Sequence, residues 1–330
     1  MMMPRRALGR SDLDVPVFIL GCGNFHGIGS TVELFGRGDD RDTSFAVLDR
    51  ALELGITMFD TANSYGGGVS EQWLGEWVAE RGVRDDVILS SKVGSRVGPG
   101  PAGHGLSRGH IREQIDTSLR RIGTDRLDLY LAHAPDESTP VEETVGAFAE
   151  LVAEGKIRYY GVSNFSRDQL ERTLSAADDL GVDHPVNLQH AFNLLAPENA
   201  LETADVCVAG GVGFTAYSPL AGGLLTGKYR ANQPPPPNSR MTLRPDGVAS
   251  TTEATFEALA RLETKAADHG VSLSALALAW AVADPAVTAL VLGPRTPEQL
   301  TGMCAAIDIS LTETDRAELS GIAATRPPDA

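Results

Sequence analysis

The chain has 330 residues, of which 42% are hydrophobic and 22% charged, and its formal net charge is −16. This composition indicates a globular protein, and an acidic surface repels nucleic acids and anionic membranes, so neither is an expected partner. The three cysteines, Cys22, Cys207 and Cys304, are widely spaced and odd in number. This disfavours a disulfide framework or a zinc site, and an N-terminus without a signal-peptide core favours a cytoplasmic protein.

Turn-forming residues around Gly9 and Ser11 predict a short hairpin over residues 5–15, ahead of the main fold. After the hairpin, short apolar runs alternate with segments of helical periodicity. The predicted strands are 17–20, 56–59, 87–90, 127–131, 159–162, 186–189, 213–217 and 289–292. The predicted helices are 43–54, 70–80, 110–121, 141–153, 167–179, 201–209, 252–268 and 274–282, followed by two segments near 297–306 and 312–322.

Strands that alternate with helices favour a parallel sheet, and eight of them favour a closed (β/α)8 TIM barrel. The glycines of residues 21–27 resemble a dinucleotide fingerprint, but their spacing is wrong and no helix pattern follows, which argues against a Rossmann fold. No linker divides the chain, so residues 1–330 are predicted to form a single barrel domain with additional C-terminal helices. The proline-rich segment 231–247 is predicted to be a long loop over the barrel mouth.

Polar side chains follow the predicted strands, and in a barrel the carboxyl ends of the strands meet at one mouth. These residues are Asn24, Asp60, Lys92, His133, Ser163, Asn164, Gln189, Tyr217 and Arg295. Taken alone, an Asp after a strand is more often a turn or cap residue, and a loop Tyr such as Tyr65 is usually a surface residue. Together, Asp60, Tyr65, Lys92 and His133 suit proton transfer to a carbonyl oxygen: a lysine ammonium lowers the pKa of a tyrosine, and the carboxylate holds the lysine in place. Reduction of the carbonyl would also require a hydride donor.

Six segments resemble the aldo-keto reductase family in their order and spacing. They are Phe59-Asp60-Thr-Ala-x-x-Tyr65-Gly66, Ser91-Lys92-Val93, Leu127-Asp-x-Tyr-x-x-His133, Gly161-Val-Ser-Asn-Phe165, Tyr217-Ser-Pro-Leu-x-x-Gly223 and Gly293-x-Arg295-x-Pro-Glu-Gln299. The resemblance covers nearly the whole chain and implies an (α/β)8 barrel that binds NADPH in an extended form. It implies Tyr65 as general acid, Asp60 and Lys92 as the pair that tunes it, and His133 as the group that orients the carbonyl.

The resemblance also implies a set of cofactor-binding residues. Ser163, Asn164 and Gln189 match residues that hold the nicotinamide carboxamide, and Tyr217 matches the aromatic residue that stacks on the nicotinamide ring. The remaining matches are Gly23, Asn24 and Asp60 near the mouth, Ser218, Leu220 and Gly222 along the pyrophosphate, and Gly293, Arg295, Thr296 and Gln299 at the adenosine end. Two positions depart from the family pattern: Met303 replaces a polar residue at the adenine end, and Ala134 replaces a larger residue after His133.

These observations predict an NADPH-dependent reductase of small aldehydes or ketones, with sugar-like compounds among the candidates and no metal. Arg295, near a helix start, would bind the 2′-phosphate of NADPH, with a surface carboxylate as its alternative partner. A cofactor-binding interaction module resembling a potassium-channel β-subunit is the main alternative function. A hydrolase or isomerase on the same fold is a second one, but it would need a metal cluster or paired carboxylates at the strand ends. The sequence is compatible with either a monomer or an oligomer.

Overall fold

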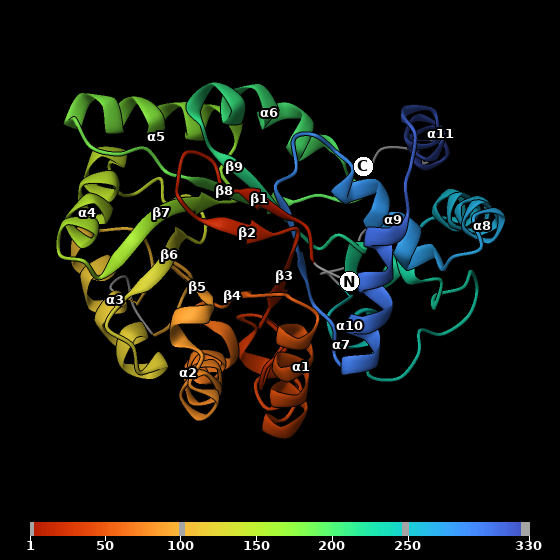
Figure 1. Ribbon diagram of the computed structural model, residues 1–330, viewed down its shortest axis with the longest axis horizontal. Coiled ribbons are helices and arrows are strands. Elements are labelled where there is room, and N and C mark those ends of the chain that lie inside the picture. The colour runs from red at the N-terminus through yellow and green to blue at the C-terminus, as the bar shows by residue number, and fades with distance from the viewer. Residues whose placement is uncertain (1–2, 99–102, 246–250, 325–330) are drawn as a thin grey trace.

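The computed structural model describes residues 3–98, 103–245 and 251–324 and shows a closed barrel of eight parallel strands surrounded by helices (Figure 1). The strands follow one another around the barrel in chain order, and the last one, β10, pairs with both β9 and β3. They are β3 (Phe18–Gly21), β4 (Met58–Asp60), β5 (Ile88–Val93), β6 (Leu127–Ala132), β7 (Ile157–Ser163), β8 (Asn187–Ala191), β9 (Gly213–Tyr217) and β10 (Ala289–Leu292). The predicted (β/α)8 barrel is confirmed.

The helices begin and end largely where the sequence places its capping residues. Ser107 caps α3 by accepting a hydrogen bond from the His110 N–H, and Gly123 ends that helix in the left-handed region at a φ of 73°. The helices are α1 (Arg41–Glu53), α2 (Val69–Arg81), α3 (Arg108–Ile122), α4 (Val141–Ala153), α5 (Arg167–Leu180), α6 (Glu198–Gly210), α7 (Arg240–Leu243), α8 (Glu253–Asp268), α9 (Leu273–Val282), α10 (Pro297–Cys304) and α11 (Glu313–Ala324). In the described part of the chain, no helix combines the length and the apolar character needed to cross a membrane.

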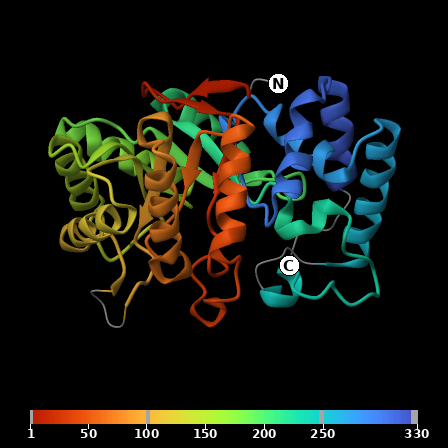
Figure 2. The same cartoon turned by 60° about the horizontal axis from the view of Figure 1, so that its bottom comes forward.

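The predicted N-terminal hairpin consists of β1 (Arg5–Ala7) and β2 (Asp14–Pro16), which pair in antiparallel fashion. Leu8, Leu13 and Val15 of this segment are buried in one cluster with inward-facing strand residues such as Ile19 and Met58. The hairpin therefore closes the amino-terminal end of the barrel. In Figure 2 it lies at the top, and the loops that follow the strands extend from the opposite side, which leaves that end for a functional site.

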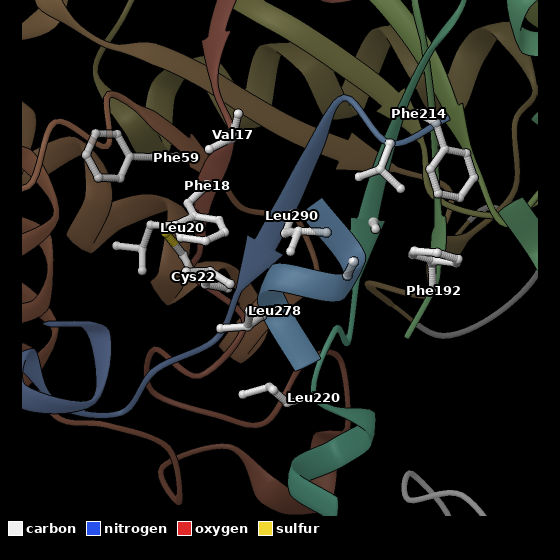
Figure 3. Packing of buried hydrophobic residues seen from close by; sticks show 14 of the residues in the cluster. Val17, Phe18, Leu20, Cys22, Phe59, Phe192, Phe214, Leu220, Leu278 and Leu290 are labelled. Carbon is white, nitrogen blue, oxygen red and sulfur yellow. Dashed lines mark hydrogen bonds between the residues drawn. The ribbon is translucent and has the colours of Figure 1, made fainter. Parts of the chain in front are cut away.

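Strand residues that point outward pack against the helices. Phe18 and Leu20 flank the inward-facing Ile19 and belong to the main core, together with Leu278 of α9. Figure 3 shows this packing around Cys22, Leu278 and the neighbouring strand residues. The period of two between inward and outward side chains determines which polar residues reach the interior of the barrel.

Two strands extend further than the sequence predicts. The strand predicted for 87–90 continues to Val93, and Asp60 is the last residue of β4 rather than the residue after it. In both cases buried polar residues continue the strand beyond its apolar run. The predicted loop 231–247 contains the short helix α7. Residues 246–247 of this loop lie outside the described residues.

Candidate active site

Lys92 and Asp60 form a buried ion pair at the carboxyl end of the barrel strands. Their side chains are 1% and 3% exposed, and the Lys92 Nζ donates to the Asp60 carboxylate. Lys92 also donates to the main-chain oxygen of Thr61 at 2.9 Å. Asp60 accepts two further hydrogen bonds, from Ser90 Oγ at 3.0 Å and from Gln189 Nε2 at 3.2 Å. The carboxylate is thus fully engaged, as a buried charge must be.

Tyr65 and His133 complete the predicted tetrad. Tyr65 begins a tight turn, Tyr65–Gly68, and its hydroxyl lies 3.4 Å from the Lys92 Nζ. The His133 ring meets the Tyr65 ring edge to face, with the centroids 5.6 Å apart. Gly23 lies next to the Tyr65 ring, since a Cβ at Gly23 would lie 3.6 Å from a ring carbon. The structure therefore brings all four predicted catalytic residues together.

The protonation states follow from burial and from these neighbours. Burial is the largest single influence on the pKa of Lys92 and lowers it, but the charges and hydrogen bonds of Asp60 and Tyr65 together outweigh burial. The pKa of Lys92 therefore lies above its usual value and the ammonium persists. Burial, with a smaller effect from Lys92, lowers the pKa of His133 to about 3, so its imidazole is neutral near neutral pH. His133 Nδ1 is buried and has no hydrogen-bond partner among the described residues.

Lys92 lowers the pKa of Tyr65, as the sequence predicts, but the net shift of that pKa is upward. Burial raises the pKa of Tyr65 above its usual value, and the charge of Lys92 only opposes that rise. Burial outweighs the charge of Lys92 because a phenolate at this position would be a charge kept away from water. Tyr65 is therefore protonated in the ligand-free protein, which is the state that a proton donor requires.

Four residues predicted to hold the nicotinamide adjoin the tetrad through hydrogen bonds. The Asn164 side chain donates to the main-chain oxygen of His133 at 2.9 Å and to Ser163 Oγ at 3.1 Å. Its Oδ1 accepts from the Tyr217 hydroxyl at 2.7 Å. Asn164 has a φ of 64°, a left-handed conformation that asparagine tolerates better than most residues. Gln189 joins this group through Asp60.

The residues predicted for the pyrophosphate follow β9 in a turn with several left-handed residues. Ser218 has a φ of 54° and Gly222 a φ of 65°, whereas the side chain of Leu220 is buried in the core (Figure 3). Lys228 lies over this turn, because a side chain at Gly223 would collide with its ammonium group. Lys228 lies outside the six segments that resemble the family, and only the fold shows that this cation lies beside the turn.

The residues predicted for the adenosine end lie at the start of α10. Thr296 caps the helix by accepting from the Gln299 N–H, and Gln299 Oε1 accepts from the Arg295 N–H at 2.9 Å. The Asn24 side chain donates to the main-chain oxygen of Gly293 at 3.2 Å. Met303 packs against the main core, so this position contributes no polar group.

Arg295 is paired with a carboxylate, the alternative that the sequence left open. Its Nε donates to Asp39 Oδ1 at 2.9 Å, and its Nη1 donates to the main-chain oxygen of Asn238 at 2.9 Å. The Asp39 side chain is 4% exposed and that of Arg295 is 39% exposed. Burial raises the pKa of Asp39, and the hydrogen bond from Arg295 opposes that rise. Sequence reasoning missed Asp39 because 256 residues separate the partners.

Within residues 3–98, 103–245 and 251–324, no group of three or more His, Cys, Asp and Glu residues could hold a metal ion. The site thus consists of a buried lysine–carboxylate pair, a protonated tyrosine and a neutral histidine. These groups can donate a proton and a hydrogen bond to one oxygen atom.

Comparison with known proteins agrees with this geometry. Residues 27–324 match the Aldo/keto reductase family. L-glyceraldehyde 3-phosphate reductase of Escherichia coli is 34% identical over 90% of this chain and 86% of the relative. A probable voltage-gated potassium channel subunit beta of Arabidopsis thaliana is 32% identical over 93% of this chain and 92% of the relative. Aldo-keto reductase str7 of Strobilurus tenacellus is 32% identical over 98% and 93% of the two chains. The chain therefore belongs to the aldo/keto reductase family, whose members are oxidoreductases that reduce carbonyl groups with a nicotinamide cofactor.

Proposed function

We propose that the protein uses NADPH to reduce a small aldehyde or ketone to the alcohol, with Tyr65 as the general acid. The observation that carries this proposal is the position of the Tyr65 hydroxyl, 3.4 Å from a lysine ammonium that is itself buried and paired with Asp60. A tyrosine held protonated beside a fixed cation can release its proton when negative charge develops on a nearby oxygen.

NADPH, when bound, supplies the hydride for the carbonyl carbon. The chain's own residues act on the carbonyl oxygen of the substrate. Tyr65 transfers its hydroxyl proton to the carbonyl oxygen as the C–H bond forms, and the ammonium of Lys92 stabilises the resulting phenolate. Asp60 keeps Lys92 charged and in place, and the neutral imidazole of His133 donates a hydrogen bond to the same oxygen. Solvent then returns the proton to Tyr65.

The hydrogen-bonded group of Ser163, Asn164, Gln189 and Tyr217 supports a nicotinamide site beside the tetrad. For substrates, the proposal covers small carbonyl compounds, including sugar-like ones. The name of the Escherichia coli relative adds a phosphorylated three-carbon aldehyde to the compounds to be tested.

The buried free thiols Cys22, Cys207 and Cys304 support a reducing, cytoplasmic location.

The decisive change is Tyr65→Phe, which removes the acid and keeps the ring. Because general acid catalysis contributes ~10²–10⁴-fold, turnover should fall by about that factor while NADPH binding stays nearly constant. Turnover is measured by NADPH absorbance with a panel of aldehydes and ketones, and binding by quenching of intrinsic fluorescence. Turnover within a factor of a few of the wild type would refute Tyr65 as the acid.

The same assay distinguishes the second candidate function. Relatives of similar identity carry the names of potassium-channel β-subunits, so similarity alone favours neither function. An interaction module would bind NADPH without consuming it at a useful rate on any carbonyl compound. The intact tetrad favours catalysis.

A further inference from the structure

Another ion pair with a buried carboxylate lies outside the barrel, between α2 and α3. Glu71 of α2 has a fully buried side chain, and its Oε2 accepts a hydrogen bond from Arg121 Nη1 of α3 at 3.1 Å. Buried carboxylates are rare, and they persist where they are paired and hydrogen-bonded. Neither residue belongs to the tetrad, and neither is in a motif that the sequence singled out.

The pair is linked to the tetrad through β5. Ser91 donates to Glu71 Oε1 at 2.7 Å. Its neighbours on either side, Ser90 and Lys92, both donate to Asp60. Successive strand residues face opposite sides of the sheet, so β5 contacts Asp60 on its inner face and Glu71 on its outer face.

A second and more direct link runs to the turn that carries Tyr65. Arg121 Nη1 donates to the main-chain oxygen of Asn63 at 2.9 Å, two residues before Tyr65. The Asn63 N–H donates to the main-chain oxygen of Lys92 at 3.1 Å. The guanidinium also packs against Gly68, which has a φ of 96° and where any side chain would collide with Arg121.

We propose that Arg121, held by Glu71, is a positioning residue that fixes the Tyr65 hydroxyl relative to Lys92. This inference rests on the proposed function, because it assigns Arg121 an effect on proton transfer from Tyr65. The peptide group at Asn63 is held on one side by β5 and on the other by Arg121. Without the guanidinium, its carbonyl loses a charged donor, and the turn can shift the tyrosine away from its place in the tetrad.

The test is Arg121→Met, made in the wild type and in the Tyr65→Phe variant. A misplacement of about 1 Å can cost up to ~10²-fold in rate, so kcat should fall by roughly 10- to 100-fold in the wild type, with the dissociation constant for NADPH unchanged. In the Tyr65→Phe background the same change should lower the residual rate less than about twofold, because the group it positions is already absent. Equal losses in both backgrounds, or no loss in the wild type, would overturn the proposal.

Arg120→Met is the matched control. Arg120 is the preceding residue of α3, is exposed, and donates to Thr117 on its own helix. Amide hydrogen exchange over residues 61–68 should rise in Arg121→Met and not in Arg120→Met. If Arg121→Met does not fold, the double variant Glu71→Gln with Arg121→Met removes both charges and should show the same loss of kcat.

Chemical rescue provides an independent readout. Arg121 is 24% exposed and, together with Arg120, lines a solvent-open hollow of about 510 Å³ between α2 and α3, so we expect a small cation to reach the position of its head group. Millimolar guanidinium should restore part of the kcat of Arg121→Ala and leave Arg120→Ala unchanged. If Tyr65→Phe alone keeps full turnover, the proposed function fails. If Tyr65→Phe is inactive but Arg121→Met acts equally in both backgrounds, only the positioning role fails.

Discussion

Replacement of Lys92 by methionine removes the one tetrad cation and keeps a side chain of similar length. The Nζ lies 3.4 Å from the Tyr65 hydroxyl, and at an effective dielectric constant of ~20 two unit charges at that distance interact by about 5 kcal/mol. If half of the charge has developed on Tyr65 in the transition state, Lys92→Met loses about half of that energy. This corresponds to roughly 10²-fold in kcat. The assay is steady-state NADPH consumption at saturating substrate, with cofactor affinity measured separately by fluorescence.

The same change should destabilise the fold, because Asp60 would remain as a buried carboxylate without its cation. Removing one partner of a buried pair typically costs about 3–5 kcal/mol, which denaturant unfolding can measure. Lys92→Met with Asp60→Asn is the control: it should recover part of the unfolding free energy and none of the rate. A kcat within about fivefold of the wild type in Lys92→Met, with NADPH still bound, would refute the electrostatic role of Lys92.

Two further predictions concern the groups around the tetrad. Arg295→Ala should weaken NADPH binding and leave NADH binding nearly unchanged. The loss of NADPH affinity should be smaller than the roughly 10- to 150-fold expected of an unpaired arginine. Asp39→Asn combined with Arg295→Ala is the control for the Asp39 carboxylate left without its partner, and equal losses for both cofactors would show that Arg295 does not bind the 2′-phosphate. The folded pKa of His133 is about 3. The pKa of this histidine in the unfolded chain is ~6.5, so the unfolded chain takes up a proton first as the pH falls. Between about pH 7 and pH 5 the wild type should therefore lose up to about 2 kcal/mol more unfolding free energy than His133→Gln. Urea unfolding at pH 7 and pH 5 measures this difference. The same loss of unfolding free energy in both proteins would contradict the prediction.

The sequence predicted the barrel because apolar runs with a strand's length alternate with amphipathic helices along the whole chain. It placed Asp60, Lys92 and His133 at one mouth for the same reason. It set the end of β5 too early, because Ser91 and Lys92 read as the start of a loop. A barrel whose interior binds polar groups continues its strands through polar residues, and a pattern of hydrophobicity cannot detect that.

The pairs that hold the site were not predictable from the sequence. Arg295 and Asp39 are far apart in the chain, and only closure of the barrel brings β3 beside β10. Glu71 lies in a helix, where a glutamate is normally exposed, and nothing local shows that it is buried against Arg121. Long-range pairing of charges follows from the fold, and the local pattern of residues does not encode it.

Charge balance constrains how this acidic chain can bind an anionic cofactor. The formal net charge is −16, so the overall field opposes a phosphate. The positive charges of the two cations assigned to the site are partly neutralised by their partners, because Lys92 is paired with Asp60 and Arg295 with Asp39. They therefore counter the negative field only in part. A 2′-phosphate would share Arg295 with a buried carboxylate, and repulsion from Asp39 would cancel part of the attraction. The pairing would therefore limit any preference for NADPH over NADH that Arg295 confers. We expect the exposed Lys228, which lies beside the turn at Gly223, to attract phosphate groups common to both cofactors.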